Sequence, residues 1–444
     1  MSQINSVSSA QTASGQPTRQ GKSIAKSLVG IGAGNAVEWF DWAIYATFAS
    51  YIAQTLFSKE NPASAFLATL GIFAVGFVAR PVGGLLFGVI GDKIGRKTAM
   101  TAAVGLAAFG SLLIAVTPSY ASIGAWASFI LLAARLLQGL AHGGELPSAQ
   151  TYLAEIAPPK QRGLYSTLIY ASGTSGIVFG TLLGAIFTTV LSDEQMQAFG
   201  WRIPFFLGAL LGLYTLIMRA RLKESNTFAA QKSAKAATAQ KSSLLSDFMA
   251  NKVKALQVIG LTVGITVVYY IWSVSTPAHA IATLHIPPTQ ALWVGVIANL
   301  VFIAALPFWG KLSDRIGRRP VMLISLIGAA ALQIPAAAFV RDSWWQLLVS
   351  MVVMLLFISG YAAISPAVYA ELFPTSIRTV GVAVPYALCV ALFGGTAAYL
   401  QAACDVWFGG SGAMMFSIYS IVLLLVSIFT VYKIKESKGI ELQD

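Results

Sequence analysis

The sequence has few charged residues for its length. Asp, Glu, Lys and Arg make up only 10% of the 444 residues, whereas soluble domains carry roughly a quarter. Hydrophobic residues make up 56%, and the mean hydropathy is +0.72. These values exclude a soluble globular protein.

The sequence contains many long apolar runs. Stretches of about 20 residues, long enough for the roughly 30 Å hydrocarbon layer, recur about twelve times and begin near residues 28, 64, 99, 123, 164, 201, 255, 290, 321, 345, 379 and 411. A transmembrane β-barrel would instead show alternating segments of about ten residues. The sequence therefore predicts an all-α polytopic membrane protein with twelve transmembrane helices.

Cysteine and histidine are also scarce. Cys389 and Cys404 are the only cysteines, and fifteen helical residues place them about 22 Å apart, too far for a disulfide. Among the three histidines, His142 begins the run H-G-G-E, which is not a His-Glu-x-x-His zinc motif. With no nucleophile constellation either, we expect no metal, no cofactor and no enzymatic activity.

The net charge of +12 reflects membrane topology. With twelve spans and both termini on one side, 24 of the 29 Lys and Arg residues fall on that side. This positive-inside pattern predicts cytoplasmic N- and C-termini and no nucleic-acid partner. The Ser/Gln/Thr-rich start has no apolar core of its own, so we expect no cleavable signal.

The chain contains an internal repeat. G-V-I-G-D-K-I-G-R-K begins at Gly88, and G-K-L-S-D-R-I-G-R-R begins at Gly310, 222 residues later. A second signature joins Glu155 to Arg162 and Glu371 to Arg378, with an offset of 216. Two repeats of similar period predict two pseudo-symmetric six-helix bundles, the architecture of a secondary transporter. The expected divisions are a polar N-terminus (1–25), a first bundle (26–222), a linker (223–254), a second bundle (255–433) and a tail (434–444).

The loop signature suggests a conformational gate. Asp92 or Asp314 can pair with Arg96 or Arg318 and accept hydrogen bonds from a neighbouring helix N-terminus. Alternatively, these charges only solvate a loop and fix the topology. The gate candidates are Gly88, Asp92, Gly95, Arg96, Lys97, Glu155, Arg162, Asp314, Gly317, Arg318, Arg319, Glu371 and Arg378.

Ionisable residues inside the spans are functional candidates, because burying a charge at mid-membrane costs roughly 3 kcal/mol. Glu38 and Asp41 lie at i and i+3 of the first span, with Tyr45 one turn further along. Two carboxylates this close repel each other, so the pair can carry protons. The alternative is a permanent ion pair with Arg80 or Arg135 that only holds helices together.

Arg80 follows an apolar stretch, and its planar guanidinium suits bidentate capture of a carboxylate. We expect it to bind an anionic substrate. In the fourth span Arg135, Gln138, His142 and Glu145 are predicted to share one helical face that lines the pathway. Arg135 and Glu145 join Glu38 and Asp41 as proton-coupling candidates, whereas Gln138 and His142 join Arg80 and Tyr45 as substrate-binding ones.

The second half lacks equivalent buried charges in this interpretation. Its candidates are polar and aromatic, and Tyr269 and Tyr361 are expected to contact substrate. An aromatic, hydrogen-bonding wall opposite a cationic one would hold a small carboxylate. For any single Tyr, packing between helices is the alternative.

The motifs resemble those of a known family. The duplicated loop and R-L-L-Q-G from Arg135 are similar to the major facilitator superfamily over all twelve spans. E-W-F-D from Glu38, R-P-V-G-G from Arg80 and G-W-R-I-P-F from Gly200 resemble its metabolite:proton symporters, and residues 109–155 are most similar to 2-oxoglutarate permeases. Pro147 and His142 depart from that pattern.

The resemblance implies alternating access, proton coupling and a location in a bacterial cytoplasmic membrane. We expect a monomeric symporter that imports a small organic acid, such as the dicarboxylate 2-oxoglutarate. The alternatives are a zwitterionic osmolyte such as betaine or proline, and a monocarboxylate or shikimate-like acid. The short tail without heptads disfavours an osmosensing transporter. A channel would need a continuous pore, and the duplicated halves favour a carrier.

Overall fold

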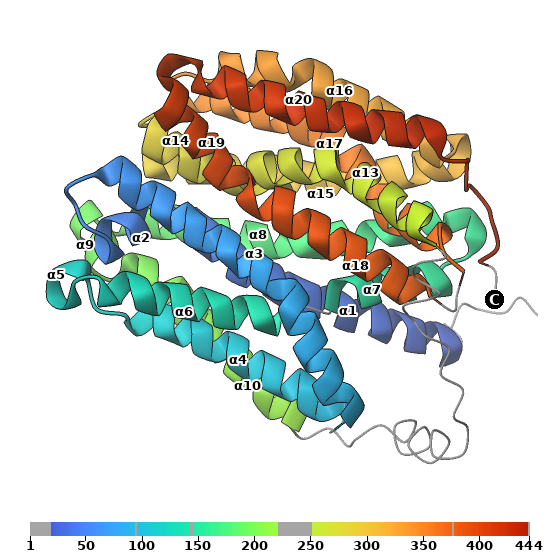
Figure 1. Ribbon diagram of the computed structural model, residues 1–444, viewed down its shortest axis with the longest axis horizontal. Coiled ribbons are helices and arrows are strands. Elements are labelled where there is room, and N and C mark those ends of the chain that lie inside the picture. Colours follow the sequence, from blue (N-terminus) through green and yellow to red (C-terminus); the bar gives the residue numbers. More distant parts are fainter. Residues whose placement is uncertain (1–18, 94–95, 143–144, 221–250, 375–376, 443–444) are drawn as a thin grey trace, which may run out of the picture.

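The computed structural model describes residues 19–93, 96–142, 145–220, 251–374 and 377–442, and the regular structure in these ranges is helical (Figure 1). Helices satisfy every backbone N–H and C=O within one segment, as the hydrocarbon layer requires of a spanning chain. The first half contains α1 (Arg19–Thr47), α2 (Ala49–Leu56), α3 (Pro62–Lys93), α4 (Arg96–Val116), α5 (Tyr120–Ile123), α6 (Trp126–Ala141), α7 (Glu145–Ile156), η1 (Pro159–Gln161), α8 (Arg162–Val190), α9 (Asp193–Ala198), η2 (Gly200–Arg202) and α10 (Ile203–Ala220).

The second half contains α13 (Lys252–Tyr269), η3 (Tyr270–Ser275), α14 (Thr276–Thr283), α15 (Pro288–Ile316), α16 (Arg318–Phe339), α17 (Trp344–Glu371), α18 (Arg378–Cys389), η4 (Val390–Gly394), α19 (Gly395–Phe408), η5 (Gly409–Ser411) and α20 (Gly412–Lys433). Two of these elements, η3 and η4, are π-helical turns inside longer helices.

The twelve predicted spans are confirmed within the described ranges. They are α1–α2, α3, α4, α6–α7, α8, α10, α13–α14, α15, α16, α17, α18–α19 and α20. Eight helical stretches there are long and apolar enough to cross a membrane by length and composition, and Thr101–Val116 and Trp126–Ala141 are shorter apolar helices. The stretch Arg378–Lys433 combines the last two spans.

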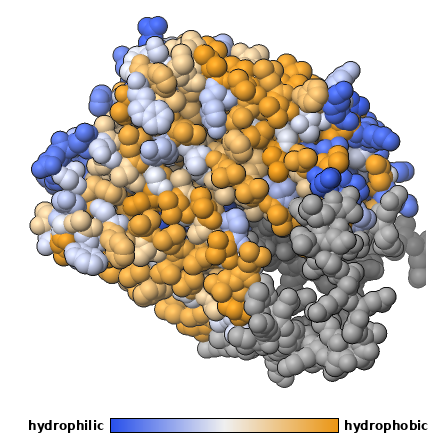
Figure 2. Space-filling model, in the orientation of Figure 1, coloured by the Kyte–Doolittle hydropathy of each residue, from blue (hydrophilic) through white to orange (hydrophobic). Residues whose placement is uncertain are grey.

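The surface carries a broad apolar belt. Figure 2 shows hydrophobic residues across the middle of one face and hydrophilic residues gathered toward the two ends. Large apolar side chains such as Leu85, Val190, Leu425 and Phe429 are exposed on the protein surface. Such a surface is stable against lipid rather than water, so it agrees with the predicted membrane protein.

The chain packs as two halves. In the first half α1 lies on α8, α3 on α6, and α4 on both α6 and α10; in the second, α13 and α16 lie on α20 while α15 and α16 lie on α17. The halves meet where α8 contacts α15 and α17, and where α3 contacts α19. In Figure 1 the blue-to-green first half lies below the yellow-to-red second half. Any site between these helices is therefore shared by both halves.

Close approach of α3 and α6 depends on glycine. A Cβ on Gly139 would overlap the carbonyl oxygen of Gly76. Because neither residue carries a side chain, the two backbones touch. This contact brings Arg80 of α3 near the end of α6.

The fourth span is not one continuous helix. The helix α6 ends at Ala141, His142 is its C-cap with φ −92° and ψ 12°, and α7 begins at Glu145. His142 still joins Arg135 and Gln138 through its contact with the Gln138 carbonyl oxygen, whereas the side chain of Glu145 lies outside the described residues, so a shared face from Arg135 to Glu145 stays a prediction. Residues 143 and 144, both glycine, lie outside the described residues.

Candidate functional site

Glu38 and Arg80 form an ion pair between α1 and α3. Arg80 Nη2 lies 3.3 Å from Glu38 Oε1, and the side chains are 12% and 5% exposed. The Arg80 guanidinium also lies 4.3 Å from a Trp42 ring centroid and 4.7 Å from that of Phe77. The two aromatic faces and the carboxylate compensate the guanidinium for the water that it loses on burial.

Asp41 has a different set of partners from Glu38. Ser111 Oγ of α4 donates to Asp41 Oδ1 at 3.3 Å, and His142 Nε2 lies 4.0 Å from Asp41 Oδ2. The two carboxylates that the sequence places on one helical face thus have different environments. Only Glu38 has an arginine as its recorded ion-pair partner.

Arg135 is fully buried in an aromatic cage. Its guanidinium carbon lies 4.1 Å from a Trp42 ring centroid, 4.4 Å from Tyr45 and 5.4 Å from Phe73. Its Nη1 donates to Gln138 Oε1 at 2.8 Å. The aromatic faces supply the negative potential that a buried guanidinium needs. We call Glu38, Asp41, Arg80, Arg135 and His142 the charge cluster.

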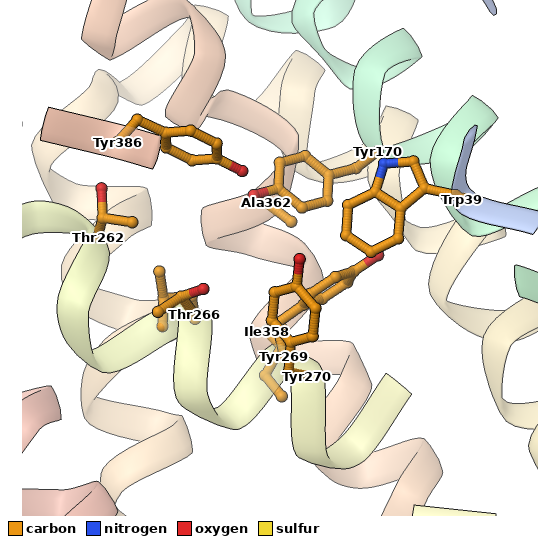
Figure 3. A pocket seen from close by; sticks show the side chains of 10 residues that line it. Trp39, Tyr170, Thr262, Thr266, Tyr269, Tyr270, Ile358, Ala362 and Tyr386 are labelled. Atoms are coloured by element: carbon orange, nitrogen blue, oxygen red, sulfur yellow. The ribbon is translucent and has the colours of Figure 1, made fainter. Parts of the chain in front are cut away.

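A small cavity lies beside the charge cluster, between the two halves. It is lined by Trp39, Tyr170, Thr262, Ile265, Thr266, Tyr269, Tyr270, Ile358, Ala362 and Tyr386. Figure 3 shows the rings of Tyr170 and Tyr386 pointing toward each other across it. The space holds about one water molecule. We call this space the aromatic cavity, and it is closed in this conformation to anything larger than water.

One aromatic ring connects the cavity to Arg80. Phe77, which contacts the Arg80 guanidinium, lies 5.2 Å from the Tyr270 ring centroid. On the other side Trp39, the residue after Glu38, lies 5.7 Å from Tyr270 and 5.9 Å from Tyr269. The charged and aromatic groups therefore form one continuous region from α1 and α3 to α13 and η3.

The predicted tyrosines fall in three different places. Tyr269 lines the aromatic cavity, and its hydroxyl lies 3.2 Å from Thr174 Oγ1. The Tyr45 hydroxyl donates to the carbonyl oxygen of Thr69 at 2.9 Å, and its ring covers Arg135. The Tyr361 hydroxyl donates to the carbonyl oxygen of Leu261 at 2.6 Å, and Tyr361 is not among the cavity-lining residues.

Four predicted gate residues pair across the two halves. Arg162 Nη1 lies 2.9 Å from Glu371 Oε1, and Arg378 Nη1 lies 2.8 Å from Glu155 Oε1. Each pair joins one residue from the first half to one from the second. We call the end of the molecule that holds these pairs the basic end.

The second loop signature closes the same end. Asp314 accepts the backbone N–H groups of Gly163 at 2.9 Å and Leu164 at 3.0 Å, at the start of α8, and Arg318 Nη1 donates to Asp314 Oδ1 at 2.7 Å. This is the geometry predicted for Asp314. The structure does not describe the gate candidates of the first copy, namely Gly88, Asp92, Gly95, Arg96 and Lys97, beyond the helical backbone that some of them share. The side chain of Glu145 also lies outside the described residues.

The C-terminal tail adds a contact that the sequence did not indicate. Glu436 Oε1 accepts the N–H of Arg318 at 2.8 Å and its Oε2 accepts that of Arg319 at 3.0 Å, which caps the start of α16. The start of α16 follows Gly317, whose φ of 110° suits glycine. Burial alone would raise the pKa of Glu436, but the N–H groups of Arg318, Arg319, Lys438 and Ser437 hold that pKa below its ordinary value.

A histidine–carboxylate contact in the second half was not among the sequence candidates. His279 Nε2 of α14 lies 3.6 Å from Asp405 Oδ2 of α19, and these side chains are 16% and 22% exposed. Both residues sit near the ends of apolar runs, where a window-based reading assigns them to loops. The sequence also missed the cavity residues Trp39, Tyr170 and Tyr386, because aromatic residues are common throughout the spans.

Known proteins with this arrangement are transporters. Residues 27–247 match the family described as "Sugar (and other) transporter", and residues 258–442 match the Major Facilitator Superfamily. The chain belongs to the major facilitator superfamily. The expectation from the sequence motifs is therefore confirmed, and this protein is a transporter rather than an enzyme.

Several relatives of the transporter are similar over most of their length. The alpha-ketoglutarate permease of Escherichia coli is 35% identical over 84% of this chain and 86% of its own. A candidate proline/betaine transporter of Staphylococcus aureus is 35% identical over 84% and 81%, and the citrate-proton symporter of Klebsiella pneumoniae is 31% identical over 83% of each chain. The proton:xylose symporter of E. coli has the same fold, with a TM-score of 0.73, 18% identity and coverage of 95% and 98%.

Proposed function

We propose that the transporter moves a small organic carboxylate together with protons by alternating access. The main support for this proposal is the charge cluster, in which two carboxylates and two guanidiniums lie beside a cavity lined by both halves. Charges are rarely kept inside spans unless they serve transport. The relatives named as an alpha-ketoglutarate permease and a citrate-proton symporter support the same class of solute.

Charge balance gives a physical basis for coupling. With Glu38 and Asp41 ionised and His142 neutral, the two arginines leave the cluster with a net charge of zero. Uptake of one proton makes it +1, and arrival of one carboxylate restores neutrality. Because uncompensated charge is costly inside the membrane, proton and anion each favour the binding of the other.

Arg80 is the proposed carboxylate ligand. Its guanidinium contacts Phe77, and Phe77 contacts Tyr270, which lines the aromatic cavity. Substrate would compete with Glu38 for its guanidinium once Glu38 is protonated. The Tyr170, Tyr270 and Tyr386 side chains could then donate hydroxyls to the remainder of a dicarboxylate such as 2-oxoglutarate.

A zwitterionic osmolyte is the second candidate. Trp39, Tyr170, Tyr269, Tyr270 and Tyr386 line the cavity, and aromatic rings gathered in this way bind quaternary ammonium groups. The relative named as a candidate proline/betaine transporter agrees with this alternative. Arg80 would then bind the single carboxylate of the osmolyte.

We propose the remaining features of the mechanism from the same contacts. The basic end faces the cytoplasm of a bacterial cell, as its Lys and Arg content suggests, and the transporter acts as a monomer because both halves belong to one chain. The cross-half pairs keep the basic end shut, while Asp41 and Glu38 exchange protons.

Uptake by purified transporter in liposomes tests the function. Radiolabelled 2-oxoglutarate is supplied with and without an inward proton gradient, and succinate, betaine, shikimate and benzoate compete with it. Gradient-stimulated uptake blocked by dicarboxylates alone supports the first candidate, whereas block by betaine supports the second. Uptake that stays proportional to concentration would reject a carrier and indicate a channel.

Two variants separate the roles of the cluster residues. Arg80→Ala should abolish saturable uptake without preventing insertion, and retained uptake would remove Arg80 from the substrate site. Asp41→Asn should leave exchange of labelled for unlabelled substrate intact but remove its response to the proton gradient. An unchanged gradient response would reject Asp41 as a proton carrier.

A further inference from the structure

A chain of buried hydrogen bonds leads from Arg135 to Asp41. Arg135 Nη1 donates to Gln138 Oε1 at 2.8 Å, Gln138 Nε2 donates to Ser111 Oγ at 2.7 Å, and Ser111 Oγ reaches Asp41 Oδ1 at 3.3 Å. Arg135, Gln138 and Ser111 are all 0% exposed. All three side chains are therefore shielded from bulk water.

Arg135 fixes which group donates and which accepts in each of these hydrogen bonds. A guanidinium only donates, so Gln138 Oε1 must accept and the amide must present its NH₂ group to Ser111. Ser111 then accepts from Gln138, which leaves its single O–H to donate to Asp41 Oδ1. Asp41 Oδ1 is thereby kept as a hydrogen-bond acceptor, and a proton that binds Asp41 must sit on Oδ2.

The protonation of His142 is fixed by the same residue, Gln138. His142 Nδ1 lies 2.6 Å from the carbonyl oxygen of Gln138. A carbonyl oxygen only accepts, so Nδ1 carries the hydrogen and the neutral ring has its lone pair on Nε2. That lone pair lies 4.0 Å from Asp41 Oδ2.

We infer that Asp41 and His142 form one proton-binding pair, with the proton between Oδ2 and Nε2, and that Gln138 and Ser111 are positioning residues that hold both partners in this orientation. This inference rests on the proposed proton coupling and names the atoms of its site. When the proton moves from Oδ2 to Nε2, an O–H bond is replaced by an N–H bond, and the neutral pair becomes an ion pair with its total charge unchanged.

The groups around the pair agree with this assignment. On α3, Arg80 faces the site; on α6, Arg135 does; and on α4, Ser111 supplies the donor. On α10, Gly208 lies against the carboxylate, because a Cβ there would come within 2.8 Å of Asp41 Oδ1. Arg135 favours the ionised form of Asp41, and both arginines disfavour a charged His142, so the shared proton rests on Asp41 Oδ2 and is donated to Nε2.

Proton binding changes the distance across the pair. Without a proton, two acceptor atoms face each other at 4.0 Å. With one, they make a hydrogen bond of about 2.8 Å, which draws Asp41 of α1 toward the residue that ends α6. Proton uptake is thus converted into a movement between two helices of the first half.

Nitrogen NMR of histidine in the purified transporter tests the tautomer. The chain has three histidines, so His142→Gln identifies the His142 signals by their loss while His279 and His285 serve as internal references. We expect neutral His142 to carry its hydrogen on Nδ1. A hydrogen on Nε2 in the neutral ring would overturn the inference.

Infrared titration of the carboxylic-acid band tests the positioning residues. Asp41→Asn assigns the band by removing it. Ser111→Ala takes one hydrogen bond from the ionised carboxylate, so the band should persist to a pH about one unit higher, while Ser111→Thr, which keeps the hydroxyl, should restore the original midpoint. Ser420→Ala is the matched control, because Ser420 is equally buried and bonds only its own helix at Phe416.

The outcomes separate this inference from the proposed function. A Ser111→Ala band that titrates like the unaltered protein would reject Ser111 as a positioning residue. Neither measurement needs substrate, so both stand even if the uptake experiment identifies a different solute. Failure of uptake with the expected tautomer and band shift would leave the proton site intact and reject only the proposed substrate.

Discussion

Arg162 of the first half donates to Glu371 of the second at 2.9 Å, and the corresponding pair with the halves exchanged is Arg378 to Glu155 at 2.8 Å. The duplicated sequence signature is thus used reciprocally, with each half supplying the arginine of one pair and the carboxylate of the other. The two pairs differ in burial, because the Glu371 side chain is 0% exposed whereas that of Glu155 is 40% exposed.

We expect Glu371→Gln to open the basic end and Glu155→Gln to have little effect. Glu371 is the carboxylate paired with the buried Arg162, whereas Arg318 also pairs with Asp314, so removal of Glu371 leaves the Arg162 guanidinium without its counter-charge, at a cost of about 3–5 kcal/mol. Arg378 is also buried, but the Glu155 side chain is 40% exposed, so water screens this pair and its loss should cost only about 1 kcal/mol.

The measurement is the labelling rate of a cysteine placed at Thr167, in a background with Cys389 and Cys404 replaced by serine. Thr167 packs against Gly310 across the two halves, so labelling reports separation there. Equal rates in both variants would contradict the assigned difference.

Gly163→Ala should weaken closure at the same end. A Cβ at this position would come within 2.5 Å of Arg318 Nη1 and 2.8 Å of Asp314 Oδ1, which forces apart the contact between α8 and the second loop signature. Gly34→Ala is the control, because no atom lies within 4 Å of its Cβ position. In detergent, the unfolding temperature should fall for Gly163→Ala and stay unchanged for Gly34→Ala. An unchanged unfolding temperature for Gly163→Ala would show that this contact is not tight.

The tail contact of Glu436 should depend on pH. The folded state holds the pKa of Glu436 below its ordinary value, so the carboxylate stabilises the docked tail above the pKa of the released tail. That stability is lost as pH falls through the lower, docked value. Protease cleavage of the tail should therefore accelerate on acidification, and Glu436→Gln should cleave fast at every pH. Cleavage of the unaltered chain that ignores pH would argue against this cap.

Arg80→Lys should not replace Arg80. Lysine keeps the charge but loses the planar group that stacks on Trp42 and Phe77 and offers two parallel donors. Loss of one such hydrogen bond corresponds to about a tenfold rise in the substrate concentration for half-maximal uptake. Transport kinetics equal to those of the unaltered protein would show that a point charge suffices.

Charge balance predicts the proton stoichiometry. If the cluster must stay neutral, a dicarboxylate should enter with two protons and a monocarboxylate with one, whereas a zwitterion entering with a proton carries net positive charge. Reversal potentials in liposomes, measured at several proton gradients, distinguish these cases. A dicarboxylate that enters with a single proton would mean that the cluster accepts a net charge.

The fold followed from the sequence more fully than the site did. Apolar runs of spanning length and two repeated signatures determine twelve helices in two halves, because lipid leaves the backbone no other solution. The reciprocal pairing of Arg162 and Arg378 was not predictable, since a repeat shows that residues correspond but not that they exchange partners.

At the site, the charged residues could be predicted from the sequence, whereas the aromatic residues could not. Glu38, Asp41, Arg80 and Arg135 stand out in apolar runs, and the structure brings them together. Trp39 and Tyr386 do not stand out in a chain with 10 Trp and 15 Tyr. Glu145 begins α7 and its side chain lies outside the described residues, so its place on the predicted face stays a prediction.

The π turns η3 and η4 give the seventh and eleventh spans a surplus residue each, beside the aromatic cavity. Tyr270 begins η3, and the last residue of η4, Gly394, lies against the Tyr270 ring. A shift of the surplus residue by one position would rotate the side chains it passes by about 100°. Room for a solute can thus be gained by a change of helical register, while the helices on either side of the turn remain intact.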